Sequence, residues 1–170
     1  MSLLSEVTLM TLPTSATVQV ESAWIDGGHM NAARYFDLFV KGGYLLMDSV
    51  GLGPAYTAQS VHQIFTVEAR ISYLREVMAG DSVAIRMRLL DVDRVRVLVL
   101  LELLNAEHDA VAATLEERFV HVDLGTRRAA AIPDALRSRL EAAVRRHAMF
   151  PVPTGHRRLL TCKPLKDKAE

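Results

Sequence analysis

The chain has 170 residues, of which 50% are hydrophobic and 24% are charged, and its formal net charge is zero. This is the ordinary balance of a globular protein, and the length fits one domain with a buried core. No apolar stretch approaches the ~18 residues of a membrane span, and the first residues lack the basic start of a signal peptide, so we expect neither.

The first part of the chain predicts a lead segment, one strand and one long helix. We expect residues 1–16 to be flexible, and the β-branched and aromatic residues of TVQVESAWI predict a strand over 17–25. Over 31–50 a polar stripe faces a broad apolar side, which predicts an amphipathic helix of about five turns. Gly42 and Gly43 lie inside it, at a cost of roughly 1 kcal/mol each relative to Ala, and indicate a kink or very close packing against another surface.

The second part predicts mainly strands. Period-two alternation or a continuous apolar run occurs over 61–74, 82–90, 95–104 and 111–123. Because the short turn sequences AGDS, DVDR and NAEHD separate these strands, we expect an antiparallel meander. Helical spacing returns over 134–148. The proline-containing residues 151–170 are predicted to form a partly disordered tail.

These elements define one architecture. A single long helix with an apolar face must bury that face, and the sheet offers the surface for it. We therefore predict an α+β fold with a curved, five-stranded antiparallel sheet wrapped around one long central helix, and a further helix near the C-terminus. This single domain is predicted to span residues 17–150.

Residues 25–39, IDGGHMNAARYFDLF, place titratable and turn-forming residues directly before the long helix. A helix N-terminus offers unpaired N–H groups and partial positive charge, which can polarise a carbonyl. There Asp26 can act as base or nucleophile, His29 can orient a substrate or carry a proton, and Gly28 lets a backbone approach closely. The structural alternative is a helix cap, because Asp and Asn31 are favoured at such positions.

The segment WIDGGHMNAARYFDLF resembles the signature of the hotdog-fold thioesterases, and the similarity continues through FTVEARISYLREVMAGD and FVHVDLGTRRAAAIP. It covers roughly residues 17–148 and is nearest to the betainyl-CoA thioesterases of carnitine breakdown, then to the hydroxybenzoyl-CoA-thioesterase-like group. The resemblance implies hydrolysis of a small acyl-CoA, with Asp26 as the catalytic carboxylate. His29 and Asn31 would position the parts, and N–H groups near Gly28 would polarise the carbonyl.

The turn departs from the family pattern. The family usually places His four residues after Asp, as in Asp-Tyr-Asn-Gly-His, whereas Asp26 and His29 are three positions apart. A displacement of about 1 Å can lower a rate on the order of 100-fold. Two alternatives therefore stay open, a non-catalytic protein that binds an acyl-CoA and a hotdog enoyl-CoA hydratase.

Five further residues are candidates for substrate binding. In a betainyl-CoA thioesterase, Trp24 or Tyr35 would hold the quaternary ammonium by cation–π attraction, worth roughly 0.5–2 kcal/mol per contact; otherwise both are core aromatics. Glu68 occupies a Thr-Val-Glu context similar to that of a family acid, with a solvent or subunit-interface role as the alternative. Arg127 and Arg128 are candidates for the coenzyme A phosphates, or are ordinary surface residues.

Other chemistries lack a motif in this sequence. There is no G-x-S-x-G, GxGxxG or Walker A pattern, and the six histidines are scattered without metal-ligand spacing. We expect no metal and no separate cofactor, since coenzyme A would be part of the substrate. Residues 124–170 carry 11 Lys and Arg against 4 Asp and Glu, which fits an anionic ligand or a solvated helix and tail, and nucleic acid is not expected.

Cellular setting and assembly follow from two further observations. Cys162 is the single cysteine and cannot form an internal disulfide, so we expect a cytoplasmic protein. Its position in the predicted tail makes it a poor nucleophile candidate. The resemblance implies a homodimer or a dimer of dimers, with active sites at the subunit boundary.

Overall fold

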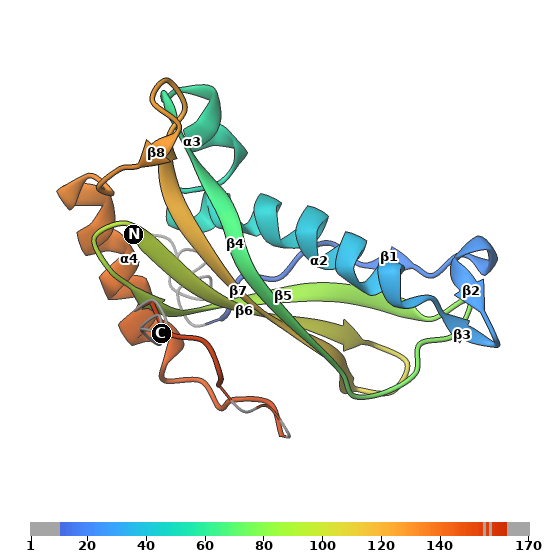
Figure 1. Ribbon diagram of the computed structural model, residues 1–170. Coiled ribbons are helices and arrows are strands. Elements are labelled where there is room, and N and C mark those ends of the chain that lie inside the picture. Colours follow the sequence, from blue (N-terminus) through green and yellow to red (C-terminus); the bar gives the residue numbers. More distant parts are fainter. Residues whose placement is uncertain (1–10, 155, 157, 163–170) are drawn as a thin grey trace, which may run out of the picture.

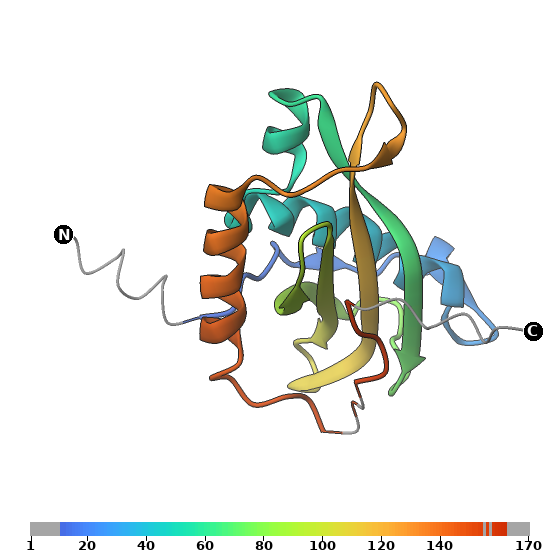
Figure 2. The same ribbon diagram turned by 60° about the vertical axis from the view of Figure 1, so that its left-hand side comes forward.

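A curved antiparallel sheet forms the body of the computed structural model, which describes residues 11–154, 156 and 158–162. The strand order is β1-β5-β6-β7-β4, and β8 pairs with β7 as a short sixth strand. Figures 1 and 2 show the sheet curling around one long helix, α2 (Ala32–Leu46). The strands are β1 (Val18–Gln19), β4 (His62–Tyr73), β5 (Ser82–Val92), β6 (Arg96–Asn105), β7 (Ala110–Asp123) and β8 (Arg128–Ala129). The α+β class and the wrapped sheet are confirmed.

Helix α2 lies very close to the sheet, which decides between the two interpretations of its glycines. A Cβ at Gly43 would lie 2.5 Å from Cδ1 of Leu101, and a Cβ at Gly42 would lie 2.8 Å from Cγ1 of Ile85. The helix runs through both positions without a break. It continues as the 3-10 helix η2 (Met47–Val50), after which Gly51 turns the chain with a φ of 88°. Close packing, rather than a kink, explains the pair.

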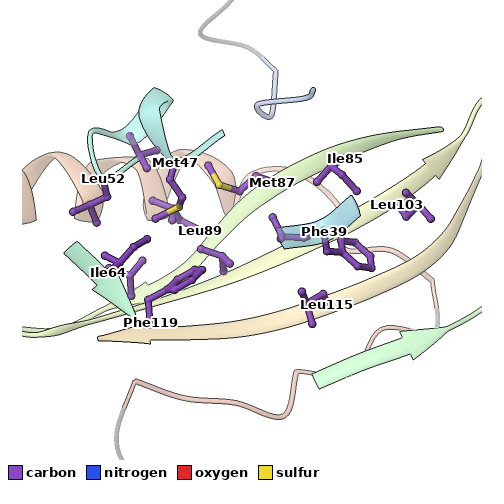
Figure 3. Close-up of a cluster of buried hydrophobic side chains, with 14 of the residues drawn as sticks. Phe39, Met47, Leu52, Ile64, Ile85, Met87, Leu89, Leu103, Leu115 and Phe119 are labelled. Atoms are coloured by element: carbon purple, nitrogen blue, oxygen red, sulfur yellow. The ribbon is translucent and has the colours of Figure 1, made fainter. Parts of the chain in front are cut away.

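The hydrophobic core fills the space between α2 and the concave face of the sheet. Phe39 of α2 is fully buried and lies among side chains from β5, β6 and β7 (Figure 3). Helix α4 (Asp134–His147) covers one end of the sheet beside β5 and buries Leu136 and Leu140. A shorter helix, α3 (Pro54–Ala58), precedes β4. The described part of the chain contains no helix long and apolar enough to cross a membrane.

The predicted strand over 17–25 is wrong beyond its first residues. Only Val18 and Gln19 pair with β5, whose first residue is Ser82. Beyond that point β5 offers no further partner, so the chain leaves the sheet and forms the 3-10 helix η1 (Ser22–Trp24). Strand length here is set by the partner strand and not by the β-propensity of the residues.

The predicted meander is also wrong for one of its four strands. β4 pairs with β7 and not with β5, so only β5, β6 and β7 form consecutive hairpins. Residues 74–81 carry the chain past three strand spacings, about 14 Å, and eight extended residues can span about 27 Å. On the way the Arg75 N–H donates to the Ala112 carbonyl at 3.0 Å, and the Gly80 N–H donates to the Val20 carbonyl at 2.8 Å. This crossing segment underlies the candidate site.

Both ends of the described chain contact the sheet. Ser15 donates its N–H to the Ile85 carbonyl at 2.8 Å, beside an isolated bridge between Thr14 and Arg86. On the outer face of the sheet, Leu160 and Cys162 are buried against Leu98. The other tail positions 155, 157 and 163–170, and residues 1–10 of the lead, lie outside the described residues, so the predicted flexibility of both segments stays a prediction.

Candidate active site

A short β-hairpin with a two-residue turn directly precedes α2. β2 (Ile25–Asp26) pairs with β3 (His29–Met30), and Asp26 lies directly opposite His29. The φ angles of Gly27 and Gly28 are 62° and 91°, and a two-residue turn with both φ positive strongly favours glycine. Directly opposed residues have Cβ atoms about 5 Å apart on one face of the hairpin. The shortened turn therefore brings the two candidate groups into cross-strand contact distance.

Backbone hydrogen bonds fix this hairpin to the rest of the fold. The Met30 N–H donates to the Val77 carbonyl of the crossing segment at 2.8 Å, and the Asn31 N–H donates to the Trp24 carbonyl at 2.9 Å. The Asn31 side chain accepts from the Ala33 N–H at 2.9 Å and so caps α2. The capping interpretation of Asn31 is confirmed.

The hairpin and the start of α2 separate two hollows, and the candidate residues divide between them. One cavity of about 350 Å³ is lined by His29 and Tyr35, together with Met30, Ala32, Tyr73, Leu74, Arg75 and Glu76. We name it the Tyr35 cavity. The other hollow, of about 470 Å³, is lined by Trp24, Asp26 and Asn31, together with Ala23, Ile25, Ala33, Arg34 and Asp37. We name it the Trp24 groove. His29 thus lines the Tyr35 cavity and Asp26 lines the Trp24 groove.

The Tyr35 cavity combines aromatic and charged side chains. The buried Tyr35 ring meets the Tyr73 ring edge to face, with centroids 5.2 Å apart. The Tyr35 hydroxyl donates to the Arg75 carbonyl at 3.4 Å. Burial raises the pKa of Tyr35, with a smaller contribution from the negative charge of Glu76. The phenol therefore stays neutral, and Glu76 contributes negative charge to this cavity.

The Trp24 groove holds a cation of the chain itself. The Arg34 guanidinium lies 6.0 Å from the centroid of the half-buried Trp24 ring. This is the outer limit of cation–π attraction. Asp37 on the same helix forms an ion pair with Lys41 at 2.9 Å. Across the described residues, the Asp26 and His29 side chains have no hydrogen bond or ion pair, so both are available to a substrate.

Glu68 lies away from this site. It forms an ion pair with Arg118 of β7. Arg118 is paired across the sheet with Leu98, which packs under Leu160 on the outer face. Within one chain, Glu68 is therefore placed for a role at the solvent-exposed surface or a subunit interface rather than for substrate binding at the hairpin.

Arg127 and Arg128 lie at the other end of the molecule, near β8, whereas the hairpin lies near the end of β4 (Figure 1). Arg127 has a φ of 58° and its guanidinium lies 5.1 Å from the Phe65 ring centroid. β4 has twelve residues, and its length of roughly 35 Å at ~3.3 Å per residue separates the two ends. One chain does not bring these arginines to the hairpin.

Sequence reasoning missed several groups at the site. Tyr73 is the last residue of β4, Arg75 and Glu76 lie in the crossing segment after it, and the fold brings all three to the Tyr35 cavity. The Ala32 N–H, at the first turn of α2, has no acceptor among the described residues, so it is available as a donor near His29. Away from this site, Glu117 is a buried acid: burial raises its pKa, and the Thr66 hydroxyl donates to it at 2.6 Å.

Comparison with known proteins gives the family. The profile of the Thioesterase-like superfamily matches residues 20–140. The betainyl-CoA thioesterase of Pseudomonas aeruginosa is 30% identical over 154 residues, covering 90% of this chain and 97% of the relative. The L-carnitine dehydrogenase/betainyl-CoA thioesterase of Agrobacterium fabrum is 35% identical over 123 residues, which are 72% of this chain and 25% of the longer relative. A Staphylococcus aureus protein solved in complex with CoA has a TM-score of 0.76 and 25% identity, covering 89% of this chain and 97% of that one. This chain belongs to the Thioesterase-like superfamily and has its hotdog fold, as the motif predicts.

Proposed function

We propose that this chain hydrolyses an acyl-CoA whose short acyl group ends in a quaternary ammonium, as in betainyl-CoA. Thioester hydrolysis is the activity supported by the superfamily and by the relatives, two of which are named betainyl-CoA thioesterases. The observation that carries the mechanism is the pairing of Asp26 with His29 across a glycine turn at the start of α2. Coenzyme A enters as part of the substrate.

Each group at the hairpin has one role in the reaction. Asp26 takes a proton from water as the water oxygen adds to the thioester carbonyl. The C–S bond then breaks, the acid is released, and the coenzyme A sulfur takes up the proton. His29 orients the thioester from the Tyr35 cavity. The N–H groups near Gly28, together with that of Ala32, stabilise the charge that develops on the carbonyl oxygen.

The lining of the Tyr35 cavity supports a cationic acyl group. Two tyrosine rings and the Glu76 carboxylate meet there, and a quaternary ammonium is attracted by aromatic faces and by negative charge. Arg75 contributes a positive charge to the same lining. The attraction of the cavity for a quaternary ammonium therefore depends on the negative charge of Glu76. The proposed ammonium site is therefore Tyr35, Tyr73 and Glu76 rather than Trp24, whose ring lies near Arg34.

The free edge of the sheet supports a homodimer. β4 is a long edge strand, and its Val67 and Tyr73 side chains are 53% and 50% exposed. Such an edge is a ready template for pairing with another strand. Antiparallel pairing of two β4 strands, centred near Val67, brings the partner subunit's Arg127 and Arg128 to the hairpin end of the first. This pairing is how we propose that both arginines reach the coenzyme A phosphates.

The test of the activity is thiol release from a panel of acyl-CoAs that includes betainyl-CoA. We expect Asp26→Asn to lower kcat at least 100-fold while coenzyme A still binds. Asp37→Asn is the matched control, because Asp37 lines the same groove but is paired with Lys41, and it should keep nearly full activity. Binding without thiol release would favour the non-catalytic alternative, and loss of enoyl absorbance without thiol release would favour a hydratase.

The test of the acyl group compares betainyl-CoA with 3,3-dimethylbutanoyl-CoA, its uncharged isostere. Glu76→Gln should lower kcat/KM for betainyl-CoA about tenfold and leave the isostere nearly unchanged, since only the cation loses an attraction. Glu107→Gln, in the exposed turn between β6 and β7, controls for the change in net charge. Equal effects of Glu76→Gln on both substrates would contradict the ammonium site but not thioester hydrolysis.

A further inference from the structure

A second and larger cavity lies far from the hairpin, beside α4. Its volume is about 680 Å³, within the usual range for small-molecule sites. The N-terminal segment, the end of α2, the 3-10 helix η2, the last turn of α4 and the residues after it all contribute to the lining, which also includes the hydroxyl residues Thr11, Thr14 and Ser49. The lining residues used in the argument below are Leu12, Leu46, Val50, Arg146, His147 and Phe150. We name it the α4 cavity.

His147 offers a hydrogen-bond donor to this cavity. The side chain is 4% exposed, and its Nδ1 accepts from the Leu89 N–H at 3.0 Å. A neutral imidazole that accepts at Nδ1 carries its proton on Nε2. Burial, with the nearby charges of Arg146 and Arg88, lowers the pKa of His147 to about 4, so the ring is neutral at pH 7. The Nε2–H has no acceptor among the described residues, and His147 lines the cavity, so this donor is available to a ligand there.

The charge at this cavity is uncompensated. Arg137 of α4 is held by Asp134 and Glu141. In contrast, neither Arg146 nor Arg139 has an ion pair within the part of the chain that the structure describes. Arg146 lines the α4 cavity, and both arginines line a smaller adjoining hollow of about 150 Å³. Arg146 thus brings a positive charge, without an ion pair among the described residues, to the lining of the α4 cavity.

We propose that the α4 cavity binds a carboxylate with a short aliphatic chain, at a site separate from the thioester site. The carboxylate accepts the Nε2–H bond of His147 and is neutralised by the Arg146 guanidinium. The aliphatic chain packs against Leu46, Val50 and Phe150. A neutral N–H donor beside one cation suits a monoanion, and the apolar part of the lining favours a ligand with an aliphatic chain over a small inorganic anion.

The test is calorimetric titration of the full chain with octanoate. We expect saturable binding that Arg146→Gln weakens about tenfold, as expected for loss of a charge-assisted contact. Arg145→Gln is the matched control: it removes the same charge from an exposed neighbour that does not line the cavity, and it should change the Kd less than twofold. Asp26→Asn should leave the Kd unchanged, which separates this site from the hairpin.

Two further probes define the ligand. Octanol lacks the charge and phosphate lacks the chain, so both should bind at least tenfold more weakly than octanoate. In the imidazole region of the ¹H–¹⁵N NMR spectrum, octanoate should shift the Nε2 signal of His147. Absence of octanoate binding, equal weakening by the two arginine variants, or phosphate binding as tight as octanoate would overturn the proposal.

Discussion

The contact between Gly43 and Leu101 provides a test of how closely α2 packs: the effect of Gly43→Ala on the free energy of unfolding should change sign when Leu101 is shortened. Ala in place of Gly within a helix stabilises by about 1 kcal/mol. Against this, the new Cβ would lie 2.5 Å from Leu101 Cδ1, well inside the optimal separation of about 3.5–4.0 Å. Leu101 is 1% exposed and cannot move into solvent. Overpacking of this kind costs about 1–3 kcal/mol, so Gly43→Ala should lower the free energy of unfolding by about 1 kcal/mol.

The sign should reverse once Leu101 is shortened. Leu101→Ala alone should cost about 2–5 kcal/mol because it leaves a cavity. In that background the Gly43→Ala methyl enters the vacated space, so only its helix-propensity gain remains, about 1 kcal/mol. The coupling between the two sites is then about 2 kcal/mol, within the range for residues in contact. Urea unfolding of the two single variants and the double variant measures it.

A fully buried leucine on another helix supplies the control. Leu140 of α4 is 0% exposed and belongs to the same core, but it does not face Gly43. In a Leu140→Ala background, Gly43→Ala should stay destabilising by the same amount as in the wild type. An additive result for Gly43 and Leu101 would refute the close-packing argument, as would a stabilising effect of Gly43→Ala in the wild type.

Three further measurements test local features. Asn31→Ala removes the cap of α2 and should cost about 1 kcal/mol in urea unfolding, whereas Asn31→Asp should cost much less. Burial raises the pKa of the Cys162 thiol to about 12, so iodoacetamide at pH 8 should label the native protein far more slowly than the urea-unfolded protein. The pKa of His147 is about 4 when folded, below its ordinary 6.5, so its contribution to stability is complete above pH 6.5 and is lost as the pH falls toward 4. His147→Gln should therefore flatten the fall in Tm across that interval.

Each of these three measurements has an outcome that would contradict its prediction. Equal losses for the two Asn31 variants would show that the side chain does not act as a cap. Fast labelling of native Cys162 would place the tail off the outer face of the sheet. An unchanged slope of Tm against pH in His147→Gln would assign the acid sensitivity to other groups.

The candidate site was predicted in part from local sequence. Asp26, His29 and the helix start at Ala32 lie close together along the chain, so turn chemistry and capping preferences are enough to place them together. The division of Asp26 and His29 between two hollows was not predictable, because it depends on what packs on each side of the hairpin. Tyr73 and Glu76 arrive from more than forty residues away, and no local pattern records that contact.

By itself, the sequence determined the types of the long elements, the amphipathic helix and the turn that opens the site, because periodicity and glycine placement are local properties. Only the tertiary structure decided the strand order and the partner of each element. β4 pairs with β7, which the length of residues 74–81 permits, and the strand after residue 17 stops where β5 begins. The close packing at Gly43 likewise became visible only once Leu101 lay opposite it. Pairing and packing depend on residues distant in sequence, and the free energy that selects among partners comes from their shared burial.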